Sequence, residues 1–410
     1  MSRKLNIIDL FAGCGGLSDG FEQTEHFHSI ACVEWEKQPC NTLQQRLHSK
    51  WGYINANEIV LQFDIQRTQE LINGWENDKV YSSGKGLLSL VNGKKIDAII
   101  GGPPCQAYSI AGRVRDENGM HDDYRNYLFE SYLEIVKRFK PKFFVFENVE
   151  GILSAKPGGV SIIERIKTSF NQYGYSIIEN LRKSALFNTA DFGVPQNRKR
   201  VIIIGVDREQ IKADPQMALT DYYTSINKKY KAVKKTTVKD AISDLPVLMP
   251  LPELIIKNGK RVSHSFNGHS IGNHVPRCHS KRDQKIFQEL AYDKMYSLNK
   301  YPDIASLIEL YYNITGIRSN FHKYNVLGLN EQSNTIPAHL YKDGLRHIHP
   351  DPIQARSITP REAARLQSFD DDFEFTGSIG DQYKMIGNAV PPKFAKAVAN
   401  ALKEFSLKYF

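Results

Sequence analysis

Six short apolar runs, separated by stretches of helical periodicity, constrain the fold of this chain more than any other feature. The clearest helical stretch is 125–140, where Leu128, Tyr132, Val136 and Phe139 recur at helical spacing. Strands that alternate with helices predict an α/β fold whose parallel sheet is covered by helices on both faces. The predicted strands are Leu5–Leu10, Ser29–Glu34, Glu58–Asp64, Ile96–Gly101, Lys142–Glu147 and Arg200–Val206.

The composition changes after Val206. Residues 207–349 contain 21 lysines and arginines against 14 aspartates and glutamates, a net +7 of the chain's +9, together with eight of its twelve histidines. Prolines at 246, 250 and 252 and the sparse periodicity are typical of a smaller, loop-rich region. We therefore expect a first domain over 1–206 and a second domain over 207–349.

Helical periodicity returns near the C-terminus. The sequence Thr359-Pro360-Arg361-Glu362 predicts a helix start, with threonine as the N-cap, proline at the first helical position and glutamate closing a capping box. Residues Pro392–Phe405 predict a final amphipathic helix. We expect the segment 350–410 to pack back onto the first domain.

Charge and cysteine content narrow the class of protein. The net charge of +9 suits a polyanionic partner such as a nucleic acid. The five cysteines are odd in number and contain no Cys-x-x-Cys pair, which favours a reducing compartment over a disulfide framework. The N-terminal apolar run is short, and no later stretch is long enough to span a bilayer. We expect a cytosolic monomer that does not bind a membrane.

A glycine-rich run over 9–16 follows the first predicted strand and opens a helix, which lets the backbone approach a ligand closely. The next two strands end at Glu34 and Asp64. The glycine spacing is not that of a Gly-x-Gly-x-x-Gly fingerprint, so S-adenosylmethionine fits better than NAD or FAD. Glu34 could bind the ribose hydroxyls, Asp64 the adenine amino group, and Trp35 could stack on the adenine ring.

Three further segments place reactive side chains at the ends of predicted strands. Cys105 is a soft nucleophile in a turn that two prolines stiffen. Glu147 ends an apolar run, where burial would raise its pKa and keep a proton available near neutral pH. Arg198 and Arg200 precede another strand, so that one could support a base or the acid while the other meets phosphate. Taken singly, these residues also fit a buried thiol, a solvated strand end and a basic turn.

Taken together, six motifs resemble those of the DNA (cytosine-5)-methyltransferase family, of the bacterial restriction-modification type. They occur in the order found in that family and cover roughly 5–206 and 355–410. Any one motif is modest evidence, whereas six in order are strong evidence. The motifs are Phe-Ala-Gly-x-Gly-Gly at 11–16, Pro-Pro-Cys-Gln at 103–106, Glu-Asn-Val at 147–149, Gln-x-Arg-x-Arg at 196–200, Arg-Glu-x-Ala-Arg-Leu-Gln at 361–367 and Gly-Asn-Ala-Val-Pro-Pro at 387–392.

The resemblance implies a Rossmann-like, S-adenosylmethionine-dependent methyltransferase sheet in a catalytic domain over 1–206, with 207–349 as a target recognition domain. Cys105 would attack carbon 6 of a flipped cytosine. Glu147 would hold N3 and the exocyclic amine, Arg200 would assist at the base, and Arg198 would belong to the same catalytic set. Carbon 5 of cytosine in a specific duplex DNA sequence would receive the methyl group, with a cognate restriction endonuclease as a candidate partner. The cofactor pocket would be lined by Phe11, Ala12, Gly13, Cys14, Gly15, Gly16, Glu34, Trp35, Asp64, Ile65, Pro104, Leu128, Asn388 and Ala389. The DNA contacts would come from Gln106, Ser109, Arg113, Arg115 and Arg125.

Three other functions are compatible with parts of this pattern. A cytosine-5 methyltransferase acting on transfer RNA could use the same catalytic residues, but the long basic insertion at 207–349 favours a protein that reads a duplex. A DNA-binding protein without activity would not need every catalytic residue type. Enzymes that methylate adenine N6 or cytosine N4 attack an exocyclic amine and need no cysteine nucleophile.

A group of histidines and one cysteine raises the hypothesis of a zinc site in the second domain. Their intervals do not match the paired short loops of structural zinc sites, and phosphate contacts or turns explain them more simply. We therefore expect no bound metal. The residues are His264, His269, His274, Cys278 and His279.

Overall fold

The computed structural model describes residues 3–104, 128–156, 159–266, 271–319, 323–342 and 344–410. The chain forms two compact units: the first consists of 1–193, 198–233 and 389–410, and the second of 194–197 and 234–388. The chain leaves the first unit at 194 and 234 and returns to it at 198 and 389, so both units are discontinuous in sequence.

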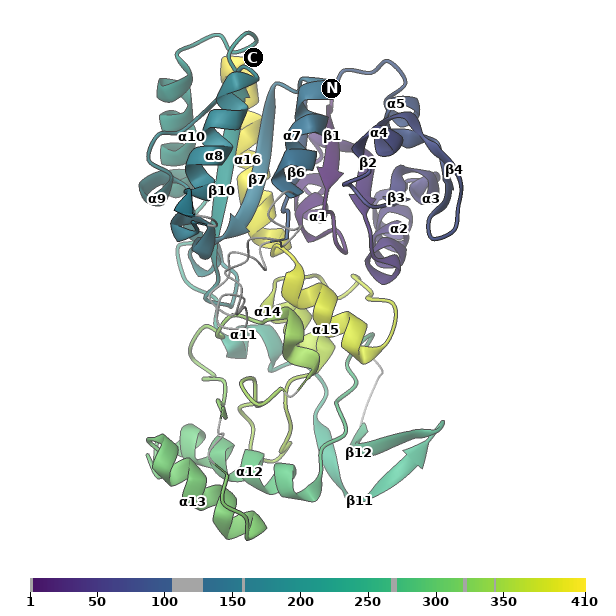
Figure 1. The fold of residues 1–410 in the computed structure, drawn as a ribbon. Helices are drawn as coiled ribbons and strands as arrows, with labels where there is room; N and C mark the ends of the chain where they lie inside the picture. The colour runs from purple at the N-terminus through teal and green to yellow at the C-terminus, as the bar shows by residue number, and fades with distance from the viewer. Residues whose placement is uncertain (1–2, 105–127, 157–158, 267–270, 320–322, 343) are drawn as a thin grey trace. The chain divides into compact units, whose positions relative to one another are not determined.

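The first unit is built on a sheet of strand order β3-β2-β1-β6-β7-β10-β8, with β9 paired to β10 (Figure 1). The strands from β3 to β7 run parallel, and β10 runs antiparallel to β7, β8 and β9. The predicted α/β fold is confirmed, but the parallel pairing predicted throughout is wrong at this edge, because an apolar run does not encode strand direction. The strands are β1 (Leu5–Leu10), β2 (Phe27–Glu34), β3 (Val60–Gln62), β6 (Ala98–Gly101), β7 (Phe143–Val149), β8 (Tyr175–Ile177), β9 (Leu186–Asn188) and β10 (Lys199–Asp207).

Strand limits differ from the predicted ones mainly at β3. β1 has the predicted bounds, whereas β2 begins two residues earlier than predicted, at Phe27. The predicted third strand is shorter, because residues Ala56–Ile59 form the helical turn α3 and β3 ends at Gln62. Asp64 therefore lies two residues beyond its strand instead of at the strand end.

Helices cover the sheet, and the C-terminal helix α16 packs directly against the first helix, α1. The contact depends on Gly20, since a Cβ atom there would lie 2.4 Å from Ala395 Cβ and 2.6 Å from the Pro392 carbonyl oxygen. A small hairpin of β4 (Trp75–Asp78) and β5 (Ser82–Gly84) also belongs to this unit. Its helices are α1 (Gly16–Glu22), α2 (Lys37–Trp51), α3 (Ala56–Ile59), α4 (Thr68–Asn73), α5 (Gly86–Val91), α7 (Leu128–Phe139), η2 (Glu150–Ser154), α8 (Ile162–Gln172), α9 (Leu181–Ser184), η4 (Thr189–Phe192), α10 (Pro215–Lys229) and α16 (Pro392–Tyr409).

The second unit combines short helices with one β-hairpin. The helix start predicted at Thr359 is confirmed: the Thr359 side chain accepts a hydrogen bond from the Glu362 N–H, and the Glu362 side chain accepts one from the Thr359 N–H. Helices α12 and α13 pack around a small apolar core that includes Ile286, Phe287 and Leu310. The elements of the second unit are α11 (Val238–Ile242), β11 (Leu248–Lys257), β12 (Lys260–Phe266), α12 (Lys281–Tyr296), α13 (Ile304–Thr315), η5 (Ala338–Tyr341), α14 (Pro360–Leu366) and α15 (Ile379–Asn388).

The boundaries of the two compact units differ from the domain boundaries that the composition predicted. Residues 207–233 lie in the first unit, because α10 packs against α16 and β8, and residues 350–388 lie in the second, where α14 packs against α11 and α15. Neither packing relationship produces a signal in charge or proline content. Within the described ranges, no helix is both long enough and apolar enough to cross a membrane.

Candidate active site

The glycine-rich loop after β1 has a tightly turned backbone. Phe11, Gly13 and Gly15 have φ values of 58°, 56° and 93°, in the left-handed region that favours glycine. A Cβ atom at Gly15 would lie 2.5 Å from Leu43 Cδ1, whereas one at Gly13 would meet nothing within 4 Å. The loop is therefore packed against the protein at Gly15 and open at Gly13, as a loop that receives a ligand requires.

Glu34 ends β2 beside this loop and accepts three backbone hydrogen bonds. The Gly13 N–H donates to Oε2 at 3.0 Å, and the N–H groups of Trp35 and Glu36 donate to Oε1 at 2.9 and 2.8 Å. Burial raises the pKa of Glu34 to about 7, although these N–H groups oppose the rise. The structure thus joins the predicted ribose-binding carboxylate to the glycine loop.

Other predicted cofactor residues are divided between surface and interior. Trp35 has 50% of its surface exposed, as expected of a ring that stacks on a ligand. Asp64 is half-buried, and its Oδ1 accepts a hydrogen bond from the Gln66 N–H at 3.0 Å. Asn388 is exposed, at the end of α15 in the second unit. Ala12, Cys14, Ile65 and Leu128 are buried, so that a ligand would meet chiefly the backbone at these positions, and Pro104 and Ala389 are half-buried.

Asp9 lies beneath the glycine loop, and nothing in the sequence marked it as a site residue. It is fully buried at the carboxyl end of β1, and its two oxygens accept no hydrogen bond from the described residues. Burial raises the pKa of Asp9 to about 8, with the nearby Ser18 opposing the rise and Glu34 adding to it. A carboxylate at a strand end does not by itself indicate a functional residue in a sequence. Its burial, which only the structure shows, marks Asp9 as a candidate.

Glu147 lies in β7 and pairs with an arginine from the neighbouring strand. Arg200 Nε is 2.7 Å from Glu147 Oε1, and each side chain has 11% of its surface exposed. Burial raises the pKa of Glu147 above its ordinary value, although Arg200 and Arg198 both act to lower it. The predicted acid is therefore buried, paired and biased toward its protonated form.

The antiparallel direction of β10 explains this pairing. Arg200 lies opposite Val149 and Ile202 lies opposite Glu147, so the start of β10 adjoins the end of β7. Were β10 parallel, its first residues would lie at the opposite edge of the sheet from Glu147. The antiparallel strand brings the second arginine of the Gln-x-Arg-x-Arg motif to the predicted catalytic edge.

The loop that leads to Cys105 is held against the end of β7. Asn148 Nδ2 donates a hydrogen bond to the Pro103 carbonyl oxygen at 3.3 Å. A Cβ atom at Gly102 would lie 2.5 Å from Glu147 Oε2, so glycine leaves the space that the carboxylate occupies. Gly102 and Asn148 thus fix the spacing between the acid and the Pro-Pro-Cys loop.

Arg198 has a different place from the one predicted. It is 1% exposed, and burial lowers its pKa. One of its terminal nitrogens donates to the Ala389 carbonyl oxygen at 3.1 Å, which links two sequence motifs of the first unit. The suggestion that one of the two arginines meets phosphate is wrong for Arg198, because its guanidinium is enclosed by protein.

Several predicted residues lie outside the described ranges. These are Cys105 and the predicted DNA contacts Gln106, Ser109, Arg113, Arg115 and Arg125. Among the other cysteines, Cys14, Cys32 and Cys40 are buried. Burial raises the pKa of each of these three thiols, that of Cys14 to about 12, which disfavours the reactive thiolate form.

The histidine group of the second unit forms hydrogen bonds within the protein. His264 Nε2 bonds to the Gln354 carbonyl oxygen at 2.9 Å, and the two ring nitrogens of His274 bond to Thr359 Oγ1 and the Pro246 carbonyl oxygen at 3.0 and 2.9 Å. Burial lowers the pKa of His264 to about 4. His274 is therefore already engaged through both nitrogens, and His269 lies outside the described residues.

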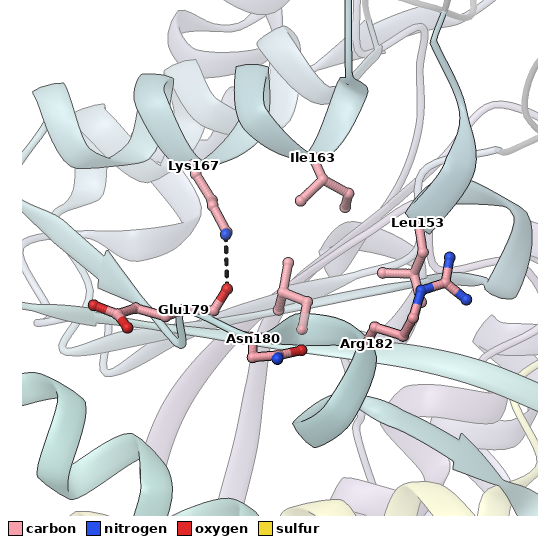
Figure 2. Close-up of a pocket in the computed structure, with 7 residues that line it drawn as sticks. Leu153, Ile163, Lys167, Glu179, Asn180 and Arg182 are labelled. Atoms are coloured by element: carbon pink, nitrogen blue, oxygen red, sulfur yellow. Dashed lines mark hydrogen bonds between the residues drawn. The ribbon is translucent and has the colours of Figure 1, made fainter.

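A shallow hollow of about 390 Å³ lies on the first unit near α8 and α9, and none of the predicted site residues lines it (Figure 2). Lys167 Nζ reaches across it to the Glu179 carbonyl oxygen at 2.8 Å. The hollow is thus distinct from the strand ends described above. It is lined by Leu153, Ile163, Lys167, Glu179, Asn180, Leu181 and Arg182.

The family model of the C-5 cytosine-specific DNA methylases matches residues 5–404. The chain belongs to this family. The methylase is 35% identical to the type II methyltransferase M.Bpa9945I of Bacillus paralicheniformis, over 97% of this chain and 98% of the relative. It is 31% identical to the type II methyltransferase M.DdeI of Desulfomicrobium norvegicum, over 97% of this chain and 88% of the relative.

Solved structures show the same fold. The methylase superposes on the crystal structure of a candidate DNA modification methyltransferase encoded within an E. coli prophage with a TM-score of 0.65 and 24% identity, covering 98% of this chain and 100% of that one. Membership of the family establishes the reaction: the methylase transfers a methyl group from S-adenosylmethionine to carbon 5 of cytosine in DNA.

Proposed function

We propose that this methylase modifies cytosine within a specific duplex DNA sequence through a covalent adduct on Cys105. The observation that carries the proposal is the buried Glu147–Arg200 pair, 2.7 Å apart, beside the loop that leads to Cys105. A buried acid paired with a guanidinium at this position suits a neutral heterocycle that must be protonated or hydrogen-bonded while it is attacked.

The chemistry begins with the cytosine ring, whose carbon 5 is a poor nucleophile. The Cys105 thiolate adds to carbon 6, and the electron pair of the carbon 5–carbon 6 double bond becomes available at carbon 5 as an enamine. Carbon 5 then takes a methyl group, which S-adenosylmethionine would supply when bound; the bond between that methyl group and sulfur would break and S-adenosylhomocysteine would be left. A base removes the proton from carbon 5, the bond between carbon 6 and sulfur breaks, and the thiolate and the aromatic ring are restored.

Glu147 and Arg200 stabilise the ring during the addition of the thiolate. Because its pKa is raised, Glu147 retains its proton to a higher pH than a solvated glutamate does, which favours donation to ring N3, and its second oxygen can accept from the exocyclic amine. Arg200 remains charged and can donate to the base as negative charge develops on the ring. Arg198 holds the Ala389 carbonyl oxygen and acts as a positioning residue.

The residues at the ends of β1, β2 and β3 fit S-adenosylmethionine. The open side of Gly13, the carboxylate of Glu34 and the exposed ring of Trp35 would hold the nucleoside. The carboxyl group of Asp9, whose pKa burial raises to about 8, lies at the end of β1 beneath the same loop. Asp64 would accept from the adenine amino group through the oxygen that the Gln66 N–H does not use.

The second unit is proposed as the part that selects the DNA sequence. It contains most of the basic 207–349 segment, and DNA-binding surfaces need positive charge. Because the relatives above are named type II methyltransferases, we place this methylase in a type II restriction–modification system beside a cognate endonuclease. Exchanging 234–388 for the matching unit of a relative should change the methylated sequence and leave the chemistry intact.

Trapping with 5-fluorocytosine tests the proposed mechanism. Fluorine cannot leave carbon 5 as a cation, so duplex DNA with 5-fluorocytosine at the target should form a denaturation-resistant complex when S-adenosylmethionine is present. The adduct should map to Cys105, and Cys105→Ser should abolish it because a hydroxyl without a strong base is a weak nucleophile. An adduct on Cys278, or methylation that survives in Cys105→Ala, would overturn the mechanism.

A further inference from the structure

The hairpin of β11 and β12 extends away from the helices of the second unit (Figure 1). Its root is fixed: the Leu248 N–H donates to Gln354 Oε1 at 3.1 Å, and the buried His264 ring bonds to the Gln354 carbonyl oxygen. The two-residue turn at its tip, Asn258-Gly259, has φ values of 49° and 72°, as tight hairpin turns require. The hairpin is thus an ordered arm with an anchored base.

The outer half of this arm exposes apolar side chains. Leu254, Ile255 and Ile256 are consecutive, and 43%, 47% and 78% of their surfaces are exposed. An exposed run of this kind on a two-stranded hairpin adds little to stability, since such a hairpin is marginal in water without a covered face. The run is therefore better explained by a surface that contacts something else.

The tip of the arm places like charges opposite each other. Lys257 pairs with Lys260 across the two strands, and Ile256 pairs with Arg261. Like charges at directly opposed positions destabilise a hairpin, and within the described residues none of these three cations has a salt bridge. From Leu248 to Phe266 the only acidic residue is Glu253, so the arm carries an excess of positive charge. An anionic partner would offset this repulsion.

The two faces of the arm differ. Ile256 and Arg261 share one face, and Ile255, Lys257 and Lys260 share the other, because cross-strand partners and alternate residues lie on the same side. Ile256 is more exposed than Ile255, so the Ile256–Arg261 face is the more open one. A two-stranded ribbon fits the major groove of duplex DNA, where arginine can bind guanine and an apolar group can contact the thymine methyl.

We propose that the β11–β12 hairpin is a DNA-contacting arm of this methylase, with Ile256 and Arg261 at the base edges and Lys257 and Lys260 on phosphates. This assignment rests on the proposed role of the second unit in selecting the DNA sequence. It adds a specific element and four specific side chains to that role. A second protein that covers the apolar run is the competing occupant, and the test separates it from DNA.

The phosphate contacts are tested by the salt dependence of binding. The probe is a duplex with the target sequence, identified by sequencing converted DNA from cells that express the wild-type methylase. Lys257→Ala/Lys260→Ala should reduce the slope of log affinity against log salt by about 1.8, at about 0.9 for each lost phosphate contact. Lys257→Arg/Lys260→Arg should restore it. The matched control Lys285→Ala/Lys300→Ala removes two exposed lysines of the same unit and should leave the slope unchanged.

The base contacts are tested by discrimination between the target and an unrelated duplex. Arg261→Lys keeps the charge but loses the bidentate hydrogen bonds to guanine. The ratio of affinities for the target and the unrelated duplex should therefore fall about tenfold or more, with little change in the salt slope. Ile256→Ser should reduce discrimination similarly. Calorimetry of S-adenosylmethionine binding should be unchanged in every variant, and an unfolding temperature equal to that of the wild type shows that the second unit of each variant is folded.

Three outcomes would overturn the assignment to DNA. The first is a salt slope in Lys257→Ala/Lys260→Ala equal to that of the wild type. The second is a loss of DNA affinity no larger than in the Lys285→Ala/Lys300→Ala control. The third is an Ile256→Ser variant in which only the oligomeric state changes. In all three cases the wild type still methylates its target, so the proposed function stands. If the wild type shows no sequence-specific methylation at all, the proposed function itself has failed.

Discussion

The Nε atom of Arg200 lies 2.7 Å from Oε1 of Glu147, and the two residues come from neighbouring strands that run in opposite directions. This contact and the burial of Glu147 act on its pKa in opposite directions. Arg200 favours the ionised form of Glu147, whereas burial favours the protonated form and has the larger influence on its pKa. The balance leaves the pKa raised, so the acid retains its proton over a wider range of pH than a solvated glutamate does.

Replacing Arg200 should therefore change the pH profile as well as the rate. In Arg200→Ala the pKa of Glu147 loses its largest lowering influence and rises further, so the alkaline limb of kcat/KM that reports its ionisation should move to higher pH. The maximal rate should fall on the order of 10²-fold, because one charged donor to the base is lost. Initial rates of methyl transfer between pH 6 and 10 measure both effects. A limb that moves to lower pH would show that Arg200 does not lower the pKa of Glu147.

Gly102→Ala tests the space that Glu147 occupies. The new methyl group would lie 2.5 Å from Glu147 Oε2, so the carboxylate must move. A displacement of about 1 Å at a catalytic acid is expected to lower kcat roughly 10²-fold, while the affinity for S-adenosylmethionine should remain near that of the wild type. The control is Gly380→Ala in α15, where the nearest atom would be at an ordinary contact distance of 3.5 Å. Equal rates in the two variants would exclude a steric role for Gly102.

Glu34 should make cofactor binding depend on pH. Its pKa is raised to about 7, and ribose hydroxyls donate best to the ionised form. The affinity for S-adenosylmethionine should therefore increase as the pH rises from 6 to 8, and binding near pH 7 should release a proton from Glu34. Calorimetry in buffers of different ionisation enthalpy measures this proton. Glu34→Gln should abolish the proton release that comes from Glu34. If the release is unchanged in this variant, the proton comes from the ligand.

The buried histidines should make the second unit unstable in mild acid. Burial lowers the pKa of His264, His279 and His349 to about 4, 3 and 4, whereas an unfolded histidine titrates near 6.5. A group whose pKa is lower in the folded state stabilises the fold above its unfolded pKa, and this contribution is lost as the pH falls below about 6.5. The total loss by pH 4 should be on the order of several kcal/mol. Scanning calorimetry from pH 7 to 4 should show an unfolding temperature that falls from about pH 6.5.

A variant separates the histidines from the carboxylates in this acid range. His264→Gln removes one titrating ring and keeps a side chain that can hydrogen-bond to the Gln354 carbonyl oxygen. Its unfolding temperature should depend less steeply on pH between 6.5 and 5, a range above the ordinary pKa of carboxylates. A pH dependence over this range that is as steep in His264→Gln as in the wild type would contradict the burial of a neutral His264 ring.

Much of the molecule could be predicted from local sequence alone. Alternating apolar runs predicted the α/β fold, and β1 has the predicted bounds because its residues are consecutive and buried. The capping box at Thr359 and Glu362 was predictable because both residues belong to one helical turn. The predicted strands placed Glu34 correctly at the carboxyl end of β2, and Glu147 lies two residues before the end of β7 instead of at it. Parallel strands bring those ends to one edge of the sheet.

Only the tertiary structure decided which side chains meet. The direction of β10 cannot be read from its apolar residues, and it alone brings Arg200 to Glu147 while Arg198 turns into the protein toward Ala389. Burial depends in the same way on neighbours far apart in sequence, which is why the shifted pKa of Asp9 was not foreseen. The sequence determined which groups the chain carries and in which local elements, because those depend on short-range periodicity. Strand direction, burial and pairing depend on contacts between distant segments, and these belong to the folded chain.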